Sequence, residues 1–202
     1  MAPYKPYPDA LGKPICGSHP SRYHGTTGQS MQGDAVDLTW TCSCCGRSFN
    51  TLSMHYAFAA PRNWFSLTEA ERTTRAKLSE DVCMIDGKEY YVRGCLEIPV
   101  SDSSEILVLG VWVSVSEDSF RYIHSKWDAE IAEDEPPRFG WLCNWIKGYP
   151  EPDEIACAVF IRSGNLRPRI VLEPADYPLA VEQHRGVTLE RVKQIAASTG
   201  HP

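Results

Sequence analysis

Two long apolar stretches stand in the middle of the chain. Residues 90–100 (YYVRGCLEIPV) and 106–115 (ILVLGVWVSV) are rich in β-branched and aromatic side chains, which is typical of strands. The Ser-Asp-Ser-Ser segment between them is typical of a turn, so together they predict an antiparallel hairpin. Three further strands are predicted near residues 138–143, 155–162 and 168–173.

Helical patterns separate and follow these strands. Ser66–Leu78 opens with the Ser-x-x-Glu sequence of a capping box, which predicts a helix over that range. A second capped helix is predicted to begin at Ser116 and a third to span Thr188–Ala197, whereas Pro178–Val181 is predicted to be an apolar turn. Consecutive strands with interspersed helices predict an α+β fold with a mainly antiparallel sheet and a few packed helices.

The chain divides into an arm and a body. Residues 1–36 are rich in Pro, Gly, Ser, Thr and Tyr without a sustained period, which predicts an extended N-terminal arm. Residues 37–202 are predicted to form a single α+β domain, since 202 residues suit one domain. An apolar content of 43% and a charged content of 23% are typical of globular proteins.

The distribution of charged residues indicates which class of macromolecule the chain binds. The net charge is −6 and the basic residues are scattered, whereas nucleic-acid-binding proteins usually concentrate them in a stripe. The densest charge run, Asp128–Glu135, is acidic and is either a solvated loop or a face for a basic protein. We therefore expect a protein partner and no nucleic acid.

The chain also shows no signal for a membrane or for export. Its longest apolar run, Ile106–Val115, is about half the length that a spanning helix needs. The opening MAPYKPYPDALGKP has no apolar core of a secretory signal, so we expect a cytoplasmic protein with mostly reduced cysteines.

A cysteine pair at the start of the body carries the strongest chemical signal. In Cys42-x-x-Cys45-Gly46, two thiolates from one tight turn can reach the same ion, and zinc is the metal that such ligands select. Cys16 and His19 in the arm have the same spacing and would complete a tetrahedral structural zinc site. The alternative is that these cysteines are reduced thiols packed as small apolar residues. Competing ligands are Cys44, His24, His55 and Cys83.

A polar cleft is a second candidate site. Strand alternation places Arg93 and Glu97 on one face of the predicted hairpin, about 13 Å apart, so each needs water or a partner from another strand. These charges either form a surface lattice of ion pairs or line a cleft with aromatic walls that binds a small or peptide ligand. The predicted ligand-binding residues are Arg93, Glu97, Trp112, Trp141, Arg167, Asp176, Glu182 and Gln183.

Several motifs resemble one bacterial family. They are Cys42–Gly46, Arg93–Pro99 with Gly110–Ser114, Phe139–Leu142 with Tyr149 and Pro150, and Asp176–Gln183 leading into Gly186 and Arg191. Over about residues 38–197 the chain is similar to the family named domain of unknown function 2199. The resemblance implies no activity. The chain has Phe49 and Tyr177 where that pattern often has histidines, which argues against metal ligation or base catalysis at those positions.

No known catalytic arrangement is present in the sequence. It lacks a phosphate-binding glycine loop, a serine-hydrolase elbow and a metalloprotease helix, so no catalytic residue is predicted. The sequence therefore predicts a non-enzymatic protein- or ligand-binding module with a structural zinc site. Two alternatives remain: an enzyme whose cleft uses Arg93, Glu97 and Glu182, and an immunity protein that neutralises a toxin.

Overall fold

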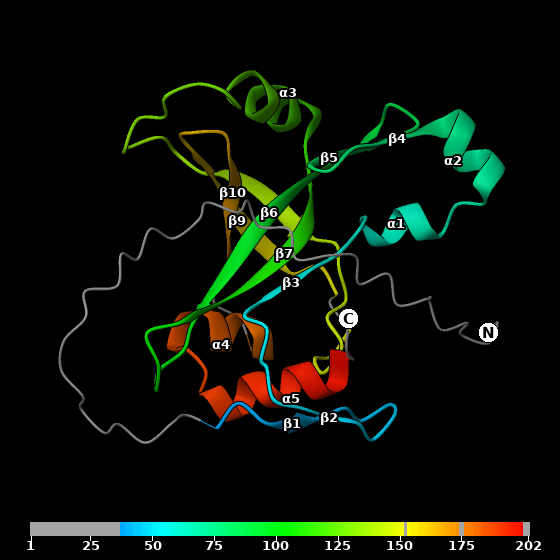
Figure 1. The fold of residues 1–202 in the computed structure, drawn as a ribbon. Helices are drawn as coiled ribbons and strands as arrows, with labels where there is room; N and C mark the ends of the chain where they lie inside the picture. Colours follow the sequence, from blue (N-terminus) through cyan, green and yellow to red (C-terminus); the bar gives the residue numbers. More distant parts are fainter. Residues whose placement is uncertain (1–36, 152, 174–175, 200–202) are drawn as a thin grey trace.

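The structure is a computed structural model that describes residues 37–151, 153–173 and 176–199 (Figure 1). The predicted N-terminal arm, residues 1–36, lies outside the described residues. The strands are β1 (Trp40–Thr41), β2 (Ser48–Phe49), β3 (His55–Ala57), β4 (Ala76–Leu78), β5 (Val82–Ile85), β6 (Glu89–Pro99), β7 (Ile106–Val115), β8 (Arg138–Leu142), β9 (Ala156–Arg162) and β10 (Leu166–Leu172). The helices are α1 (Arg62–Phe65), α2 (Glu69–Arg75), α3 (Glu117–Ser125), α4 (Pro178–Arg185) and α5 (Leu189–Thr199).

The predicted hairpin is the centre of the fold. β6 and β7 pair antiparallel in continuous register from Tyr90 opposite Val115 to Pro99 opposite Ile106. The predicted strands near 138–143, 155–162 and 168–173 are β8, β9 and β10, and each pairs with the next. The α+β class and the mainly antiparallel sheet are therefore confirmed.

The pairings close into a ring. β7 pairs with β8, β8 with β9, β9 with β10, and β10 returns to β6 in a parallel pairing. Because β6 and β7 also pair with each other, strands β6 to β10 form a closed structure that we call the barrel. β5 pairs antiparallel with the first part of β6, from Glu89 to Val92, and β4 pairs with β5. β3 pairs with β7 in parallel.

A glycine allows the ring to close. A Cβ atom on Gly94 of β6 would lie 2.5 Å from Cδ1 of Ile170 and 2.8 Å from the carbonyl oxygen of Pro168, both in β10. A larger residue would push β10 away from β6, so this close approach requires glycine.

Apolar side chains fill the barrel and cover part of its outside. Residues on one face of β6, among them Val92, Leu96 and Ile98, are fully buried in the main core. The opposite face contributes Tyr91 to a second apolar cluster that also contains Trp112 of β7. In Figure 1, α4 and α5 lie below the strands and α3 lies above them.

The first predicted helix is shorter than expected. α2 begins after Thr68, whose hydroxyl accepts from the Glu71 amide at 3.3 Å, while the Glu71 carboxylate accepts from the Thr68 amide at 2.9 Å. The capping box therefore starts two residues later than the predicted one at Ser66. Residues Ala76–Leu78, predicted as the last helical turn, instead form β4 because they pair with β5.

The apolar segment predicted as a turn is a helix. α4 starts with Pro178, whose fixed φ suits the first position of a helix. It ends before Gly186, which has φ of 81° and lies so close to the chain that a Cβ would be 2.9 Å from the Pro99 carbonyl oxygen. The predicted helices at Ser116 and Thr188–Ala197 are confirmed as α3, with Ser116 as its N-cap, and α5.

Candidate metal centre

The cysteine motif forms the turn of the small hairpin β1–β2. The Cys42 amide donates to the Arg47 carbonyl and the Gly46 amide donates to the Cys42 carbonyl, both at 2.9 Å. Gly46 has φ of 69°, a conformation that favours glycine. We call residues Trp40–Phe49 the knuckle. Its tight turn is the geometry that the Cys-x-x-Cys-Gly spacing predicts.

Three thiols meet on this turn. The sulfur atoms of Cys42, Cys44 and Cys45 all lie within 4.8 Å of one another. Cys42 is buried and the other two are exposed, so an ion can reach them from solvent. The structure thus brings the two predicted ligands Cys42 and Cys45 together and adds Cys44, which the spacing rule alone did not select.

Hydrogen bonds between these thiols give Cys42 and Cys44 different pKa values. The Sγ atoms of Cys42 and Cys44 are 3.0 Å apart. The Cys44 thiol, followed by the backbone amides of Cys44 and Cys45, stabilises the thiolate and lowers the pKa of Cys42 to about 6. The same bond, with burial, raises the pKa of Cys44 to about 11. One sulfur is therefore ready as an anionic ligand near neutral pH.

The cluster fits zinc in the chemistry of its ligands, and its sulfur–sulfur distances are close to those of a zinc site. Zinc binds thiolates at about 2.3 Å, which puts the sulfurs of a tetrahedral site about 3.8 Å apart. The upper limit of 4.8 Å allows this spacing, although Cys42 and Cys44 would have to separate from 3.0 Å if both bind. Three sulfurs leave one position for another ligand. The predicted partners Cys16 and His19, and the competitor His24, lie outside the described residues.

The other competing ligands are not part of this group. Cys83 is fully buried in the second apolar cluster, where burial raises its pKa to about 12 and holds it as a neutral thiol. His55 is on β3, which pairs with β7. Neither belongs to the cysteine group found among the described residues.

A small apolar contact holds the knuckle on the C-terminal helix. The Trp40 and Phe49 rings stack with their centroids 4.7 Å apart, and Trp40 Nε1 donates to the Thr51 carbonyl at 2.8 Å. The backbone amide and the hydroxyl of Ser43 both donate to the Ala197 carbonyl, at 3.0 and 2.7 Å. Figure 1 shows β1 and β2 beside α5. Phe49, which stands where the family pattern often has a histidine, packs against Trp40.

The predicted cleft residues on the hairpin have different surroundings. Arg93 is 2% exposed, with its guanidinium carbon 5.9 Å from the centre of the buried Trp112 ring. Burial, and secondarily the positive charge of Arg167, lower the pKa of Arg93. Glu97 forms an ion pair of 2.8 Å with Arg162 of β9.

The predicted residues of the C-terminal motif serve the packing of α4. Glu182 accepts from Arg191 Nε at 2.7 Å and from the Tyr149 hydroxyl. The buried Gln183 accepts from the Leu172 amide and donates to the Ile170 carbonyl, both at 2.7 Å, so it ties α4 to β10.

The eight predicted residues do not line one cleft. Gly186 places the end of α4 at Pro99, and Arg93 lies six residues earlier on β6, which corresponds to about 20 Å. Trp141 lies on β8, is 40% exposed and packs edge-on against Phe139. Arg167 of β10 pairs with Asp81 near Arg93, and Asp176 is exposed just before α4. Strand alternation correctly placed Arg93 and Glu97 on one face, but it carries no information on where α4 docks.

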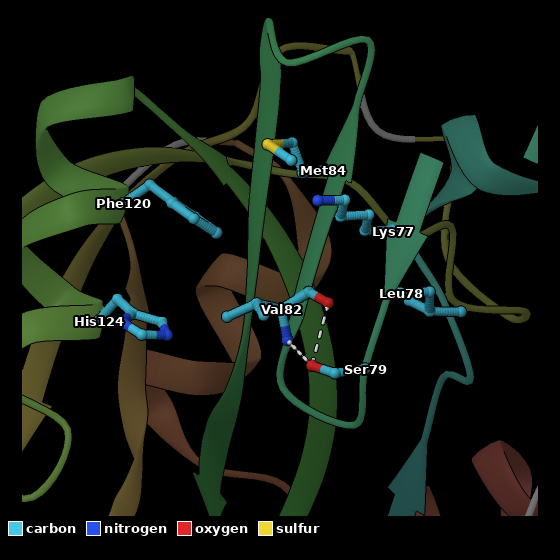
Figure 2. A pocket seen from close by; sticks show the side chains of 7 residues that line it. All are labelled: Lys77, Leu78, Ser79, Val82, Met84, Phe120 and His124. Carbon is cyan, nitrogen blue, oxygen red and sulfur yellow. Dashed lines mark hydrogen bonds between the residues drawn. The ribbon is translucent and has the colours of Figure 1, made fainter. Parts of the chain in front are cut away.

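A hollow is present elsewhere, between the β4–β5 hairpin and α3 (Figure 2). Its volume of about 230 Å³ is below the range of about 300–1,000 Å³ that is usual for ligand sites. None of the predicted ligand residues is among its lining residues Lys77, Leu78, Ser79, Val82, Met84, Phe120 and His124.

Comparisons with known proteins assign the chain to a family but not to an activity. Residues 41–187 match the model of the family described as "Uncharacterized protein conserved in bacteria (DUF2199)". Neither the curated proteins nor the solved structures include a match to the chain. Within the described part of the chain, no helix is long and apolar enough to cross a membrane.

Proposed function

The chain belongs to this bacterial family, and we propose that it is a binding protein whose knuckle holds one structural zinc ion. The observation that carries the proposal is the convergence of Cys42, Cys44 and Cys45 on one tight turn. A set of thiolates around one ion favours zinc over magnesium or calcium, which prefer oxygen ligands.

The proposed ion is structural because its protein ligands would close the coordination sphere. Cys42 and Cys45 are the constant pair in this proposal, and Cys16 with His19 complete the tetrahedron. Cys44 is the alternative third ligand, in which case one arm residue suffices. Four protein ligands leave no position for a reacting water, so the ion would order the chain rather than catalyse a reaction.

The carboxylates support binding rather than catalysis. The enzyme alternative requires Glu97 and Glu182 to act in a common cleft. Each instead has an arginine partner, Arg162 or Arg191, and the two pairs lie on different elements. We therefore propose a protein partner, as the acidic net charge of −6 favours a basic surface over nucleic acid. The seven described cysteines are free thiols, in keeping with the proposed cytoplasmic location.

The zinc proposal is tested by metal analysis of protein purified without chelator. We expect about one zinc per chain, as the single tetrahedral site requires. Replacement of Cys42 or Cys45 by Ser should remove the metal. The matched control is Cys143→Ser, which changes a partly exposed thiol outside the knuckle and should keep the zinc.

The same measurement identifies the remaining ligands. Loss of zinc in Cys16→Ala and His19→Ala, with zinc retained in Cys44→Ser, would support the arm as the second half of the site. The opposite result would make Cys44 the third ligand. Charge-transfer absorption of the cobalt-substituted protein counts the bound thiolates independently. Metal-free protein after purification at neutral pH, with no uptake of added zinc, would contradict the proposal.

A further inference from the structure

Arg93 carries hydrogen-bond donors that no described residue accepts. Its side chain is buried, and Nη1 donates to the Glu80 carbonyl at 3.3 Å. The buried Nε and Nη2 atoms have no hydrogen-bond partner among the residues that the structure describes. Buried donors of a charged group are costly to leave unpaired, because they have lost water without gaining an acceptor.

The two unused donors are the pair that recognises an oxyanion. Nε–H and Nη2–H project from the same edge of the planar guanidinium and can bind two oxygens of one carboxylate or phosphate. The hydrogen bond of Arg93 to the Glu80 carbonyl uses Nη1, so no described residue accepts a hydrogen bond from the Nε–Nη2 edge. The free edge therefore has the geometry of a bidentate anion site.

The nearby carboxylate is already engaged. Asp81 accepts from Arg167 Nε at 2.5 Å, and the side chain of Arg167 is 10% exposed. Asp81 and Arg167 are both close enough to influence the charge of Arg93. The Asp81 carboxylate is thus bound to Arg167, whereas the Arg93 guanidinium donates to the Glu80 carbonyl.

More arginines lie on the same outer face of the sheet. Arg169 is opposite Cys95 of β6, two residues along from Arg93, and its guanidinium carbon is 4.9 Å from the centre of the Phe160 ring. Arg162 donates to the Arg167 carbonyl at 2.6 Å. Arg162 and Arg167 are paired with Glu97 and Asp81, so the attraction of this face for anions comes mainly from Arg93 and Arg169.

We propose that Arg93, with Arg167 beside it, anchors a site for the terminal carboxylate or phosphate group of a small anionic ligand. The site is independent of zinc in the knuckle. Because Arg93 is 2% exposed, the ligand inserts its terminal oxyanion, and the rest of the molecule extends toward the more exposed Arg169. The exposed residues Ser79 and Glu80 border the point of entry, since the Glu80 carbonyl contacts the guanidinium.

The test follows the Nε–H signal of Arg93 by NMR while inorganic phosphate or acetate is added at constant ionic strength, with chloride as the control. We expect a saturable shift with one of the two anions, which decides between phosphate and carboxylate. Arg93→Lys keeps the charge but removes the two-donor edge, so binding measured by calorimetry should weaken about tenfold or more. Arg169→Lys, on the exposed part of the face, should change affinity by no more than about twofold.

A second variant protects the test against misfolding of Arg93→Lys. Asp81→Asn removes a negative charge close to Arg93 and should tighten anion binding, because the incoming anion is then repelled less. Zinc content measured on the same samples separates failure of this site from failure of the metal site. A signal that neither phosphate nor acetate shifts beyond the chloride control would overturn the proposal. Unchanged affinity in Arg93→Lys, or no gain in Asp81→Asn, would do the same.

Discussion

The knuckle and the barrel are ordered by different means. The knuckle has two strands of two residues each, and its buried apolar cluster contains Trp40, Cys42 and Ala196. The barrel is built on strands of 11 and 10 residues and has a continuous apolar interior. A two-stranded hairpin is marginal by itself in water, whereas a closed sheet around a core is stable without further links.

This difference explains why each region can hold its candidate functional groups. In the knuckle, three sulfur atoms converge because their residues lie on one tight turn, and a bound metal would add the stability that the small apolar cluster lacks. In the barrel, apolar burial is large enough to tolerate a buried arginine, two of whose donors have no acceptor among the described residues. We expect the barrel to fold without metal and the knuckle to depend on it.

The largest predicted effect is the loss of Trp112 from the barrel wall. Trp112 is fully buried, and its Nε1 donates to the Phe58 carbonyl at 2.9 Å. Trp112→Ala should lower the free energy of unfolding by about 3–5 kcal/mol, because it leaves a large cavity and an unpaired carbonyl. Urea denaturation gives this value. Trp141→Ala is the control, since that side chain is 40% exposed and should cost about 1 kcal/mol or less. Equal losses would show that the second cluster contributes little.

An intermediate effect is expected at the end of the barrel, where α4 meets α5. Glu182→Ala removes the acceptor of both the buried Tyr149 hydroxyl and Arg191 Nε. We expect a loss of about 1–3 kcal/mol in the free energy of unfolding, the cost of leaving such groups without a partner.

Glu117→Ala breaks the exposed pair with Arg121 on α3 and serves as the control for Glu182→Ala, with a much smaller expected loss because water screens that pair. If the two variants lose the same amount, Glu182 contributes no more than a surface ion pair and is available to bind a ligand.

The smallest effect on global stability is expected from titration of the metal-free knuckle. The pKa of Cys42 is lowered from its ordinary value near 9 to about 6, so ionisation favours the folded turn. This contribution is fully present above the ordinary value and is lost as the pH falls through about 6. Thiolate absorbance should show a transition near pH 6, and hydrogen exchange in residues 40–49 should speed up below it. The urea midpoint of the barrel should stay unchanged.

Removing the Cys44 thiol tests the cause of the lowered pKa of Cys42. Cys44→Ala should move the low transition toward the ordinary pKa, since the Cys44 thiol is the main group that stabilises the Cys42 thiolate. Cys143→Ala should leave it in place, because burial raises the pKa of that thiol to about 11. A single thiolate transition near pH 9 in the unmodified protein would show that the thiols do not share protons in this way.

Local sequence patterns predicted the features that depend on residues close together in the chain. The β-branched and aromatic content of residues 90–100 and 106–115, with a turn between them, was enough to predict the β6–β7 hairpin. The Cys-x-x-Cys-Gly spacing likewise predicted a tight turn that brings Cys42 and Cys45 together. The bounds of α2 were predicted less well, because Ala76–Leu78 can continue a helix or pair with β5.

The sequence by itself determined strands β6 to β10, helices α3 and α5, and the position of the cysteine turn, because these depend on side-chain period and short-range hydrogen bonds. Tertiary structure alone decided that β10 returns to β6 and closes the barrel, since that pairing joins residues far apart in the chain. It also separated Arg93 from Glu182 by docking α4 at the opposite end of β6, which no pattern within either segment encodes. Tertiary structure also decided that Arg93 is buried beside Trp112 with two donors that no described residue accepts, whereas strand alternation could only place the residue on a face.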